Sequence, residues 1–140
     1  MELVVIDPRS DPRYASELDL RFRVLREPLG FQRHQVRFAG EDDALHLVAV
    51  REARVVGCVL FDFASGRLRA MAVLPDGQRS GIGRQLVERL EHTLRLRGVR
   101  QVTLHARMPA IGFYERLGYV AEGEPFTEIG LLHQAMARVL

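Results

Sequence analysis

The organisation of this chain is clearest around residues 71–86, which read MAVLPDGQRSGIGRQL. The first residues are apolar, and Pro75, Asp76 and Gly77 then interrupt them, which is typical of the end of a strand. From about Ser80, apolar residues return at three- and four-residue spacing, which predicts an amphipathic helix. The segment therefore predicts a strand, a glycine-containing turn and a helix in immediate succession.

The turn before this helix has the chemistry of an anion site. Unpaired N–H groups at a helix N-terminus point outward, and the helix dipole adds about half a positive charge there. Gly81 and Gly83 have no Cβ, so a phosphate can approach the main chain closely. Arg79 and Arg84 flank them and can pair with phosphate oxygens. The turn matches neither a nucleotide-binding P-loop nor a dinucleotide fingerprint, and taken alone it equally fits an ordinary helix start.

Hydrophobic periodicity predicts further strands and helices on both sides of this segment. On the N-terminal side we expect a strand at 3–6, an amphipathic helix at 12–26, a long loop at 31–44, strands at 45–50 and 55–63, and a strand at 68–74. On the C-terminal side we expect the helix to end near Gly98, followed by a strand at 99–106 and a short helix at 109–117. Residues 131–140 are ambiguous between helix and strand. This mixture predicts an α/β (α+β) fold with helices packed on a mixed sheet.

Composition fits one globular domain, residues 1–140. The chain is 47% hydrophobic and 27% charged, which allows a core of its own. Its apolar stretches are far shorter than the roughly 20 residues of a membrane-spanning helix, and no secretory leader is visible, so we expect no membrane partner and a cytoplasmic location. The 20 basic residues are all Arg and are scattered, which argues against a nucleic-acid partner. Cys58 lies in an apolar run and is expected to be a buried hydrophobic residue.

Two segments carry a family resemblance. Residues 71–86 resemble motif A of the GNAT superfamily, a strand ending in Ala-Val-x-Pro followed by Gln/Arg-x-x-Gly-x-Gly/Ala at a helix start. Residues 110–119 read AIGFYERLGY and resemble motif B, in which an Ala precedes Phe-Tyr-Glu-x-Leu-Gly-Phe/Tyr. The two segments stand in the family's order with a strand between them. Residues 123–136 also resemble the tail of the ElaA-like bacterial branch, with Leu131 and Leu132 in place of the usual Ile-Pro.

The resemblance implies a fold and a co-substrate. The fold is a mixed, mostly antiparallel sheet splayed at the acyl-CoA site, with helices on both faces and a strand at 131–140. The co-substrate is acetyl-CoA, and no metal is expected. Met71 and Val73 would pair with the pantetheine amides. The pyrophosphate would be held by Gln78, Arg79, Ser80, Gly81, Ile82, Gly83 and Arg84. The family is often dimeric, so a homodimer is compatible with the resemblance.

Attack of an amine on the thioester expels a CoA thiolate, which a nearby hydroxyl can protonate or stabilise. Tyr114 occupies the position where the family often places this acid; the alternative is a tyrosine packed in the core. The amine must also lose a proton, and several side chains near the splay are equal candidates for the base: Glu27, Asp62, His46, His105, Glu128 and His133. The ElaA-like resemblance implies that His46, Glu128 and His133 line the acceptor side; the alternative is that the two histidines pair structurally with backbone carbonyls.

The leading hypothesis is therefore an acetyl-CoA-dependent N-acetyltransferase that acts on a primary amine of a small molecule or protein. Direct attack is favoured, since no nucleophilic Cys or Ser stands beside a base in the motifs. The alternative is a CoA-binding sensor or regulatory module with little catalysis. The acceptor is not specified, and the residues that decide it are expected in the loop at 31–44. Glu41, Asp42 and Asp43 in that loop either attract a cationic amine or form an ordinary solvated charge run.

Overall fold

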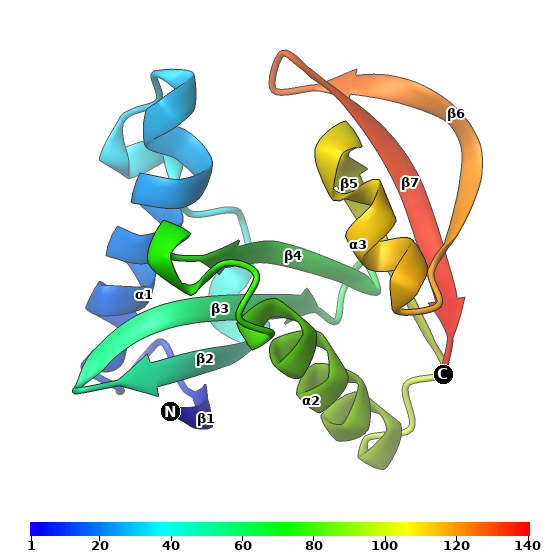
Figure 1. Ribbon diagram of the computed structural model, residues 1–140. Helices are drawn as coiled ribbons and strands as arrows, with labels where there is room; N and C mark the ends of the chain where they lie inside the picture. The colour runs from blue at the N-terminus through cyan, green and yellow to red at the C-terminus, as the bar shows by residue number, and fades with distance from the viewer.

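The computed structural model describes residues 1–140 and is built on one seven-stranded sheet (Figure 1). Its strands, in chain order, are β1 (Glu2–Ile6), β2 (Leu45–Arg51), β3 (Arg54–Asp62), β4 (Arg67–Val73), β5 (Gln101–Arg107), β6 (Val120–Glu128) and β7 (Leu131–Val139). The order across the sheet is β1-β2-β3-β4-β5-β7-β6. Every neighbouring pair is antiparallel except β4 and β5, which are parallel. The expected mixed, mostly antiparallel sheet is confirmed.

The α-helices are α1 (Arg13–Arg21), α2 (Ile82–Leu96) and α3 (Ile111–Arg116). None of the helices is long and apolar enough to span a membrane. The chain also forms a π-helical turn, η1 (Phe22–Arg26), and the 3₁₀ turns η2 (Glu27–Leu29), η3 (Arg33–Gln35), η4 (Glu41–Asp43), η5 (Pro75–Gly77) and η6 (Met108–Ala110). The predicted helix at 12–26 thus changes from α to π geometry after Arg21, and the tail at 131–140 is a strand, β7.

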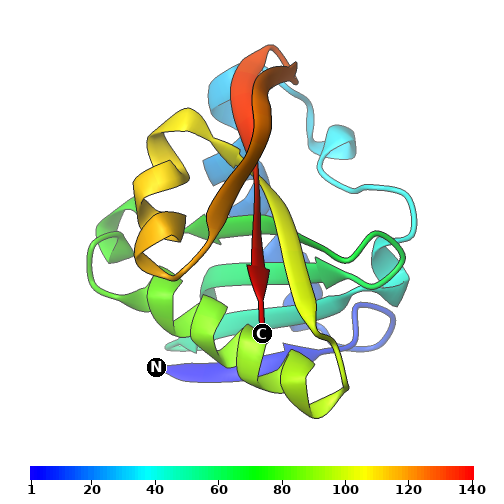
Figure 2. The same ribbon diagram turned by 90° about the vertical axis from the view of Figure 1, so that its right-hand side faces the viewer.

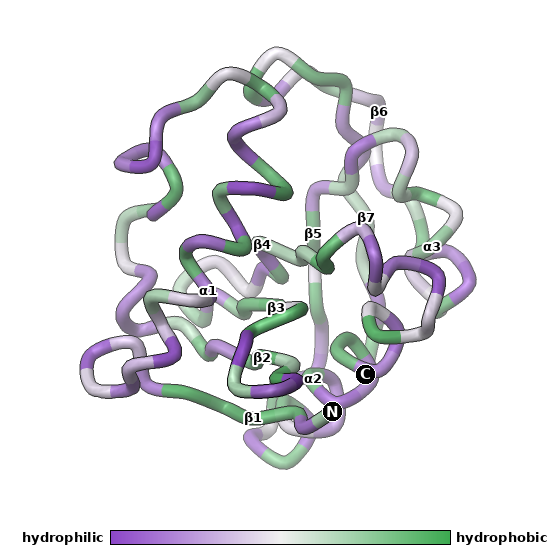
Figure 3. Tube along the Cα trace, turned by 60° about the vertical axis from the view of Figure 1, so that its left-hand side comes forward, coloured by the Kyte–Doolittle hydropathy of each residue, from purple (hydrophilic) through white to green (hydrophobic).

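Helices cover both faces of the sheet at β3. Both α1 and α2 pack against this strand, and its residues 55–61 are all buried. Because successive strand residues point to opposite faces, burial of a continuous run requires cover on both faces. The side of α2 turned to the sheet is the predicted apolar stripe of Ile82, Leu86, Val87, Leu90 and Leu94. In Figure 3 the central strands are mostly apolar, and apolar and polar residues alternate along the helices.

The sheet divides between β4 and β5. These strands share one residue pair, Arg67 opposite Thr103, and then separate. Figures 1 and 2 show that β5, β6 and β7 run steeply across the direction of β2, β3 and β4. A β-bulge places Ala70 and Met71 opposite a single residue of β3, and Ala70 has a φ of 53°. Beyond Arg67, the edge of β4 therefore has no partner strand, as the expected splay requires.

A fully buried charged cluster joins α1 to the segment that precedes β2. The guanidinium of Arg21 lies 3.0 Å from the carboxylate of Glu17 and 2.8 Å from each carboxylate oxygen of Glu41. The two ring nitrogens of His46 lie 2.9 Å from Glu17 and 2.7 Å from the carbonyl oxygen of Glu41. Burial lowers the pKa of His46, but these acceptors outweigh burial, so the pKa is raised overall. Because both ring nitrogens of His46 face oxygen acceptors, the contacts favour the protonated ring, and Arg21 and His46 then balance the two carboxylates.

Removal of one charge from this cluster tests its contribution to stability. We expect Glu41→Gln to lower the free energy of unfolding by about 3 kcal/mol, because Arg21 remains buried with one carboxylate instead of two. The matched control is Asp42→Asn, the next residue, whose exposed carboxylate pairs with Arg37 at the surface. Urea unfolding of both variants measures the effect. Equal free energies of unfolding for the two variants would show that the buried cluster does not stabilise the fold.

Candidate active site

Two cavities lie along the open edge of β4 and share part of their walls. Their volumes are about 450 Å³ for the first cavity and about 510 Å³ for the second cavity. Met71 from β4, Ala110 from η6 and Phe113 from α3 line both of them. Both volumes are in the range of small-molecule sites. The shared wall lies where β4 and β5 separate, so the two cavities suit two substrates that react with each other.

The second cavity is formed around the turn that the sequence predicts to bind phosphate. It is lined by Gln78, Arg79, Gly81, Gly83 and Arg84, and also by Val73 and Arg116. No side chain caps the start of α2. The backbone N–H groups from Gly81 to Arg84 make no hydrogen bond within the protein. Free N–H donors at the positive end of a 15-residue helix fit a phosphate or diphosphate.

The two glycines of this turn have different structural roles. Gly81 has a φ of 88°, in the left-handed region that favours glycine. A Cβ on Gly83 would lie 3.3 Å from Cζ of Phe113, so any side chain there would press on the wall that the two cavities share. Gly81 thus permits the backbone conformation of the turn. The missing side chain at Gly83 leaves space between the turn and Phe113.

The remaining predicted donor-side residues divide by whether their side chains line a cavity. Met71 and Val73 both line the second cavity. The carbonyl oxygen of Val73 already accepts a 2.9 Å hydrogen bond from Nε2 of Gln78. The side chains of Ser80 and Ile82 do not line the second cavity. The Ser80 hydroxyl donates to the carbonyl of Gly77, and Ile82 is buried in the core. Only the backbone of these two residues is available at the turn.

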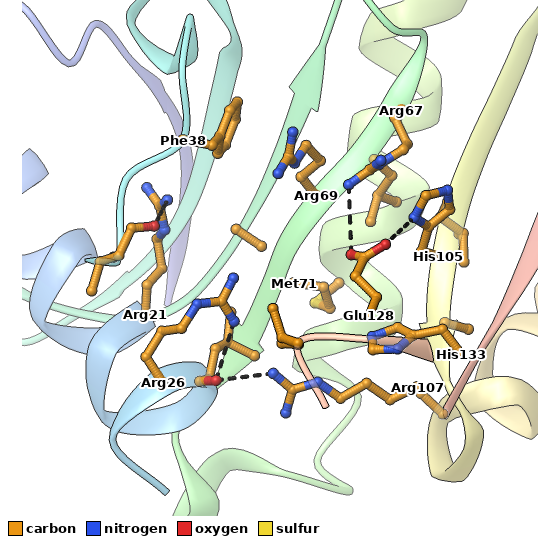
Figure 4. Close-up of a pocket in the computed structure, with 18 of the residues that line it drawn as sticks. Arg21, Arg26, Phe38, Arg67, Arg69, Met71, His105, Arg107, Glu128 and His133 are labelled. Carbon is orange, nitrogen blue, oxygen red and sulfur yellow. Dashed lines mark hydrogen bonds and ion pairs between the residues drawn. The ribbon is translucent and has the colours of Figure 1, made fainter. Parts of the chain in front are cut away.

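The first cavity is the one lined by carboxylate and imidazole groups (Figure 4). Nδ1 of His105 lies 2.8 Å from Oε2 of Glu128, and Nη2 of Arg67 lies 4.0 Å from Oε1 of the same carboxylate. Burial raises the pKa of Glu128, but the hydrogen bond to His105 and the nearby positive charges outweigh burial and hold this pKa below its usual range. Glu128 is therefore ionised at neutral pH and paired with His105.

His133 also lines the first cavity, and its side chain is buried. Its Nδ1 lies 2.9 Å from the carbonyl oxygen of Leu131, and its ring stacks on Phe126. Because a carbonyl oxygen only accepts hydrogen bonds, Nδ1 carries a proton. In the neutral ring, Nε2 is then the nitrogen with a free lone pair. His133 is thus oriented by its backbone contact as a proton acceptor.

Tyr114 is 6% exposed and its side chain lines the first cavity. Its ring makes edge-to-face contacts with Phe113 and Tyr119. Burial raises the pKa of Tyr114, so the hydroxyl keeps its proton at neutral pH. The hydroxyl of Tyr119 donates a 2.8 Å hydrogen bond to Glu91, whereas that of Tyr114 makes no hydrogen bond within the protein. Tyr114 is therefore the tyrosine of this pair whose donor is free for a ligand.

Several expectations about the acceptor side are corrected by the structure. His46 is fully buried and lines neither cavity, so the prediction that it lines the acceptor side is wrong. Its neighbours Glu17 and Arg21 belong to α1, far away in the sequence, and no local pattern indicates this packing. Two candidate bases, Glu27 and Asp62, also line neither cavity.

The acidic run at 41–43 does not face the first cavity with free carboxylates. Glu41 is bound by Arg21, Asp42 pairs with Arg37, and Asp43 pairs with Arg9. The same buried cluster brings Glu17, Glu41 and His46 within reach of one another, and the guanidinium of Arg21 bridges the two carboxylates. Glu41 is therefore a packing residue of the segment before β2, whereas Asp42 and Asp43 are solvated surface carboxylates.

Cys58 is fully buried, as expected, and its thiol donates to the carbonyl of Ala70 at 3.2 Å. Burial raises the pKa of Cys58. No Cys, Ser or Thr lines either cavity. The site therefore contains no side chain suited to form a covalent acyl intermediate.

Comparison with known proteins gives the family. A family model described as an acetyltransferase (GNAT) domain matches residues 23–140, so the chain belongs to the GNAT acetyltransferase family. A Bacillus subtilis (strain 168) protein assigned as an acetyltransferase is 30% identical over 98 residues, which are 69% of this chain and 67% of that relative. The family model covers both segments that resemble motifs A and B, so the family expected from them is confirmed.

Solved structures give the same fold over nearly the whole chain. Escherichia coli ElaA superimposes with a TM-score of 0.86 at 18% identity, covering 99% of both chains. An aminoglycoside 6′-N-acetyltransferase complexed with coenzyme A superimposes with a TM-score of 0.80 at 18% identity, covering 99% of this chain and 97% of the other. Acetyl-CoA is the acetyl donor that the GNAT fold uses. The free N–H groups before Gln85 and the space beside Gly83 fit its diphosphate.

The double variant Arg79→Ala/Arg84→Ala tests the phosphate turn. We expect it to raise the Kd for coenzyme A by about tenfold or more, because two guanidinium groups that line the second cavity are lost. The matched control is Arg89→Ala/Arg95→Ala, which removes the same charge from exposed positions of α2. Calorimetric titration with coenzyme A measures both values. A Kd that is the same in the two double variants would place the diphosphate elsewhere.

Proposed function

We propose that this chain is an acetyl-CoA-dependent N-acetyltransferase that transfers an acetyl group to a primary amine by direct attack. The observation that carries the proposal is the meeting of two cavities at Met71, Ala110 and Phe113. One cavity has the donors for a diphosphate, and the other has groups suited to move protons. In this arrangement the thioester of acetyl-CoA lies at the shared wall and the amine approaches it from the first cavity.

The donor arm would run along the edge of β4 that has no partner strand. Backbone groups on a free strand edge pair readily with amides, and the pantetheine arm contains two of them. The edge is free because β4 and β5 share only the pair at Arg67 and Thr103. Met71 lies at the bulge on this edge and lines both cavities. These features support backbone pairing at Met71 and Val73.

His133 is our proposed general base. An alkyl ammonium has a pKa of about 10.4, so an acceptor amine must lose a proton before it can attack. His133 presents Nε2 with a free lone pair, because Nδ1 donates to the carbonyl of Leu131. Glu128 is already hydrogen-bonded to His105 and has a lowered pKa, which makes it a weaker base. We assign to Glu128 the placement of the ammonium group before it is deprotonated.

Tyr114 is our proposed stabiliser of the leaving group. As the amine nitrogen bonds to the carbonyl carbon, the carbon–sulfur bond breaks and negative charge collects on sulfur. The hydroxyl of Tyr114 keeps its proton because burial raises its pKa, and it has no other acceptor within the protein. A hydrogen bond to the developing thiolate stabilises the transition state and lowers the barrier. The absence of Cys, Ser and Thr from both linings supports direct attack over a covalent intermediate.

Removal of the Tyr114 hydroxyl tests this role. We expect Tyr114→Phe to lower kcat about 100-fold, because the donor to the leaving thiolate is lost, while the Kd for coenzyme A stays unchanged. The control is Tyr119→Phe, which removes a hydroxyl that donates a hydrogen bond to Glu91. This variant should lower the free energy of unfolding and leave kcat close to the wild-type value. Thiol release from acetyl-CoA measures the rate. A Tyr114→Phe enzyme with the wild-type kcat would make Tyr114 a packing residue.

The basicity of the acceptor tests the role of His133. We expect His133→Asn to lower the rate at least tenfold with an alkyl amine, because its ammonium form must be deprotonated in the site. With an amine of low pKa, which is already neutral at pH 7, the same variant should lower the rate much less. Parallel thiol-release assays on the two acceptors measure this difference. Equal losses on both acceptors would assign His133 to positioning and not to proton removal.

A further inference from the structure

The lining of the first cavity is unbalanced in charge. The chain as a whole contains 20 basic and 18 acidic residues. The lining contains six arginines but a single carboxylate, Glu128; the arginines are Arg21, Arg26, Arg37, Arg67, Arg69 and Arg107. The composition of the chain explains why these cations are Arg and not Lys. It does not explain why the acidic residues are missing from this surface.

Not all six arginines are available to a ligand. Arg21 is neutralised in the buried cluster, and Arg37 pairs with Asp42 at 2.6 Å. Arg67 has Glu128 at 4.0 Å, and its buried Nε has no partner. The other three have no carboxylate within 4.0 Å, and all are partly buried: Arg26, Arg69 and Arg107. We call these three residues the free arginine cluster.

Two members of the free arginine cluster meet at one backbone oxygen. Nη1 of Arg26 and Nη2 of Arg107 lie 3.2 Å and 2.9 Å from the carbonyl oxygen of Leu25 (Figure 4). Burial lowers the pKa of both guanidinium groups, and the charge of Arg107 lowers that of Arg26 further. Like charges held together in a partly buried place repel each other unless an anion lies between them. The pair therefore has the character of an anion site.

The third member is held in place by an aromatic ring. The guanidinium carbon of Arg69 lies 3.9 Å from the centre of the Phe38 ring, so its position is fixed by packing instead of by a carboxylate. Burial and the neighbouring charge of Arg67 lower the pKa of Arg69. Figure 4 shows Arg69 on the same side of the cavity as Arg67, across from Arg26 and Arg107. Its N–H donors remain available to a planar or tetrahedral anion.

We propose that the acceptor of this enzyme is a small amine that also carries a carboxylate or a phosphate, and that Arg26 and Arg107 bind this anionic group. Arg69, on the other side of the same cavity, adds positive charge that favours an anionic acceptor. The proposal rests on the proposed N-acetyltransferase function and names the chemical class of its acceptor. The anionic group and the amine lie in one cavity, since the free arginine cluster, Glu128 and His133 all line it. A volume of about 450 Å³ suits a small molecule.

The same charges disfavour a polycationic acceptor. Each additional ammonium group of such a molecule would be desolvated beside guanidinium groups that have no carboxylate of their own. The cavity supplies one carboxylate, Glu128, which is enough for one ammonium group. The charge balance therefore fits an acceptor with one amine and one anionic group, and an aminoglycoside or polyamine fits it poorly.

Matched pairs of acceptors test the proposal. Each of the twenty amino acids is compared with its carboxamide, and glucosamine 6-phosphate with glucosamine, with spermidine as the polycation. Thiol release from acetyl-CoA gives kcat/KM for each compound. We expect the anionic member of at least one pair to exceed its neutral counterpart by 100-fold or more. The amino acids and the phosphorylated sugar distinguish a carboxylate from a phosphate.

Variants then assign the effect to the free arginine cluster. We expect Arg107→Gln to raise KM for the preferred anionic acceptor at least tenfold, and Arg69→Gln to raise it by a smaller factor. Each variant should reduce the preference for the anionic over the neutral acceptor by the same factor, with KM for acetyl-CoA unchanged. Arg107→Lys should recover part of the loss, because the charge is kept. The control is Arg37→Gln, which also lines the cavity but is paired with Asp42 and should behave as the wild type.

The possible outcomes separate this inference from the proposed function. If neutral amines or spermidine react as well as anionic ones, the enzyme is an N-acetyltransferase and the anionic acceptor is refuted. If no amine releases thiol, calorimetric titration of the anionic compounds into the coenzyme A complex tests whether the cavity binds anions. Binding that Arg107→Gln abolishes would support the anion site and count against the transferase, whereas no binding would count against both.

Discussion

The single residue pair between β4 and β5 is the constraint on which the rest of this structure depends. Had the two parallel strands stayed paired, the edge of β4 would be filled by β5 and no cavity would form there. Their separation instead exposes backbone groups next to Met71, while the bulge at Ala70 turns β4 toward the opening. The free N-terminus of α2 lies at one end of this edge, and the ionisable side chains lie at the other.

The charged residues divide into two groups with different consequences. Arg21, Glu17, Glu41 and His46 neutralise one another in a buried cluster, and they thereby fix the segment that leads into β2. The free arginine cluster is close by but lacks such partners, so its charge is available to a ligand. Because interactions between charges are stronger in a partly buried site than in water, this excess selects substrates by charge.

The donor half of the site could be predicted from the sequence, because its strand, turn and helix are contiguous and each has a local signal. The acceptor half could not, because it is assembled from η1, β4, β5, β6 and β7, and Arg26 meets Arg107 across 81 positions of the sequence. His46 was misplaced for the same reason, since its partner Glu17 lies on α1. Hydrophobic periodicity likewise predicted a helix up to Arg26 but not its change to π geometry.

In the proposed reaction, the thioester lies at the wall shared by the two cavities, between the phosphate turn and the free arginine cluster. A crystal structure with acetyl-CoA bound measures this most directly. We predict the diphosphate at the N–H groups from Gly81 to Arg84 and the sulfur atom beside Met71, within hydrogen-bonding distance of the Tyr114 hydroxyl. A thioester found away from the edge of β4, with the Tyr114 hydroxyl still buried among aromatic rings, would contradict the account.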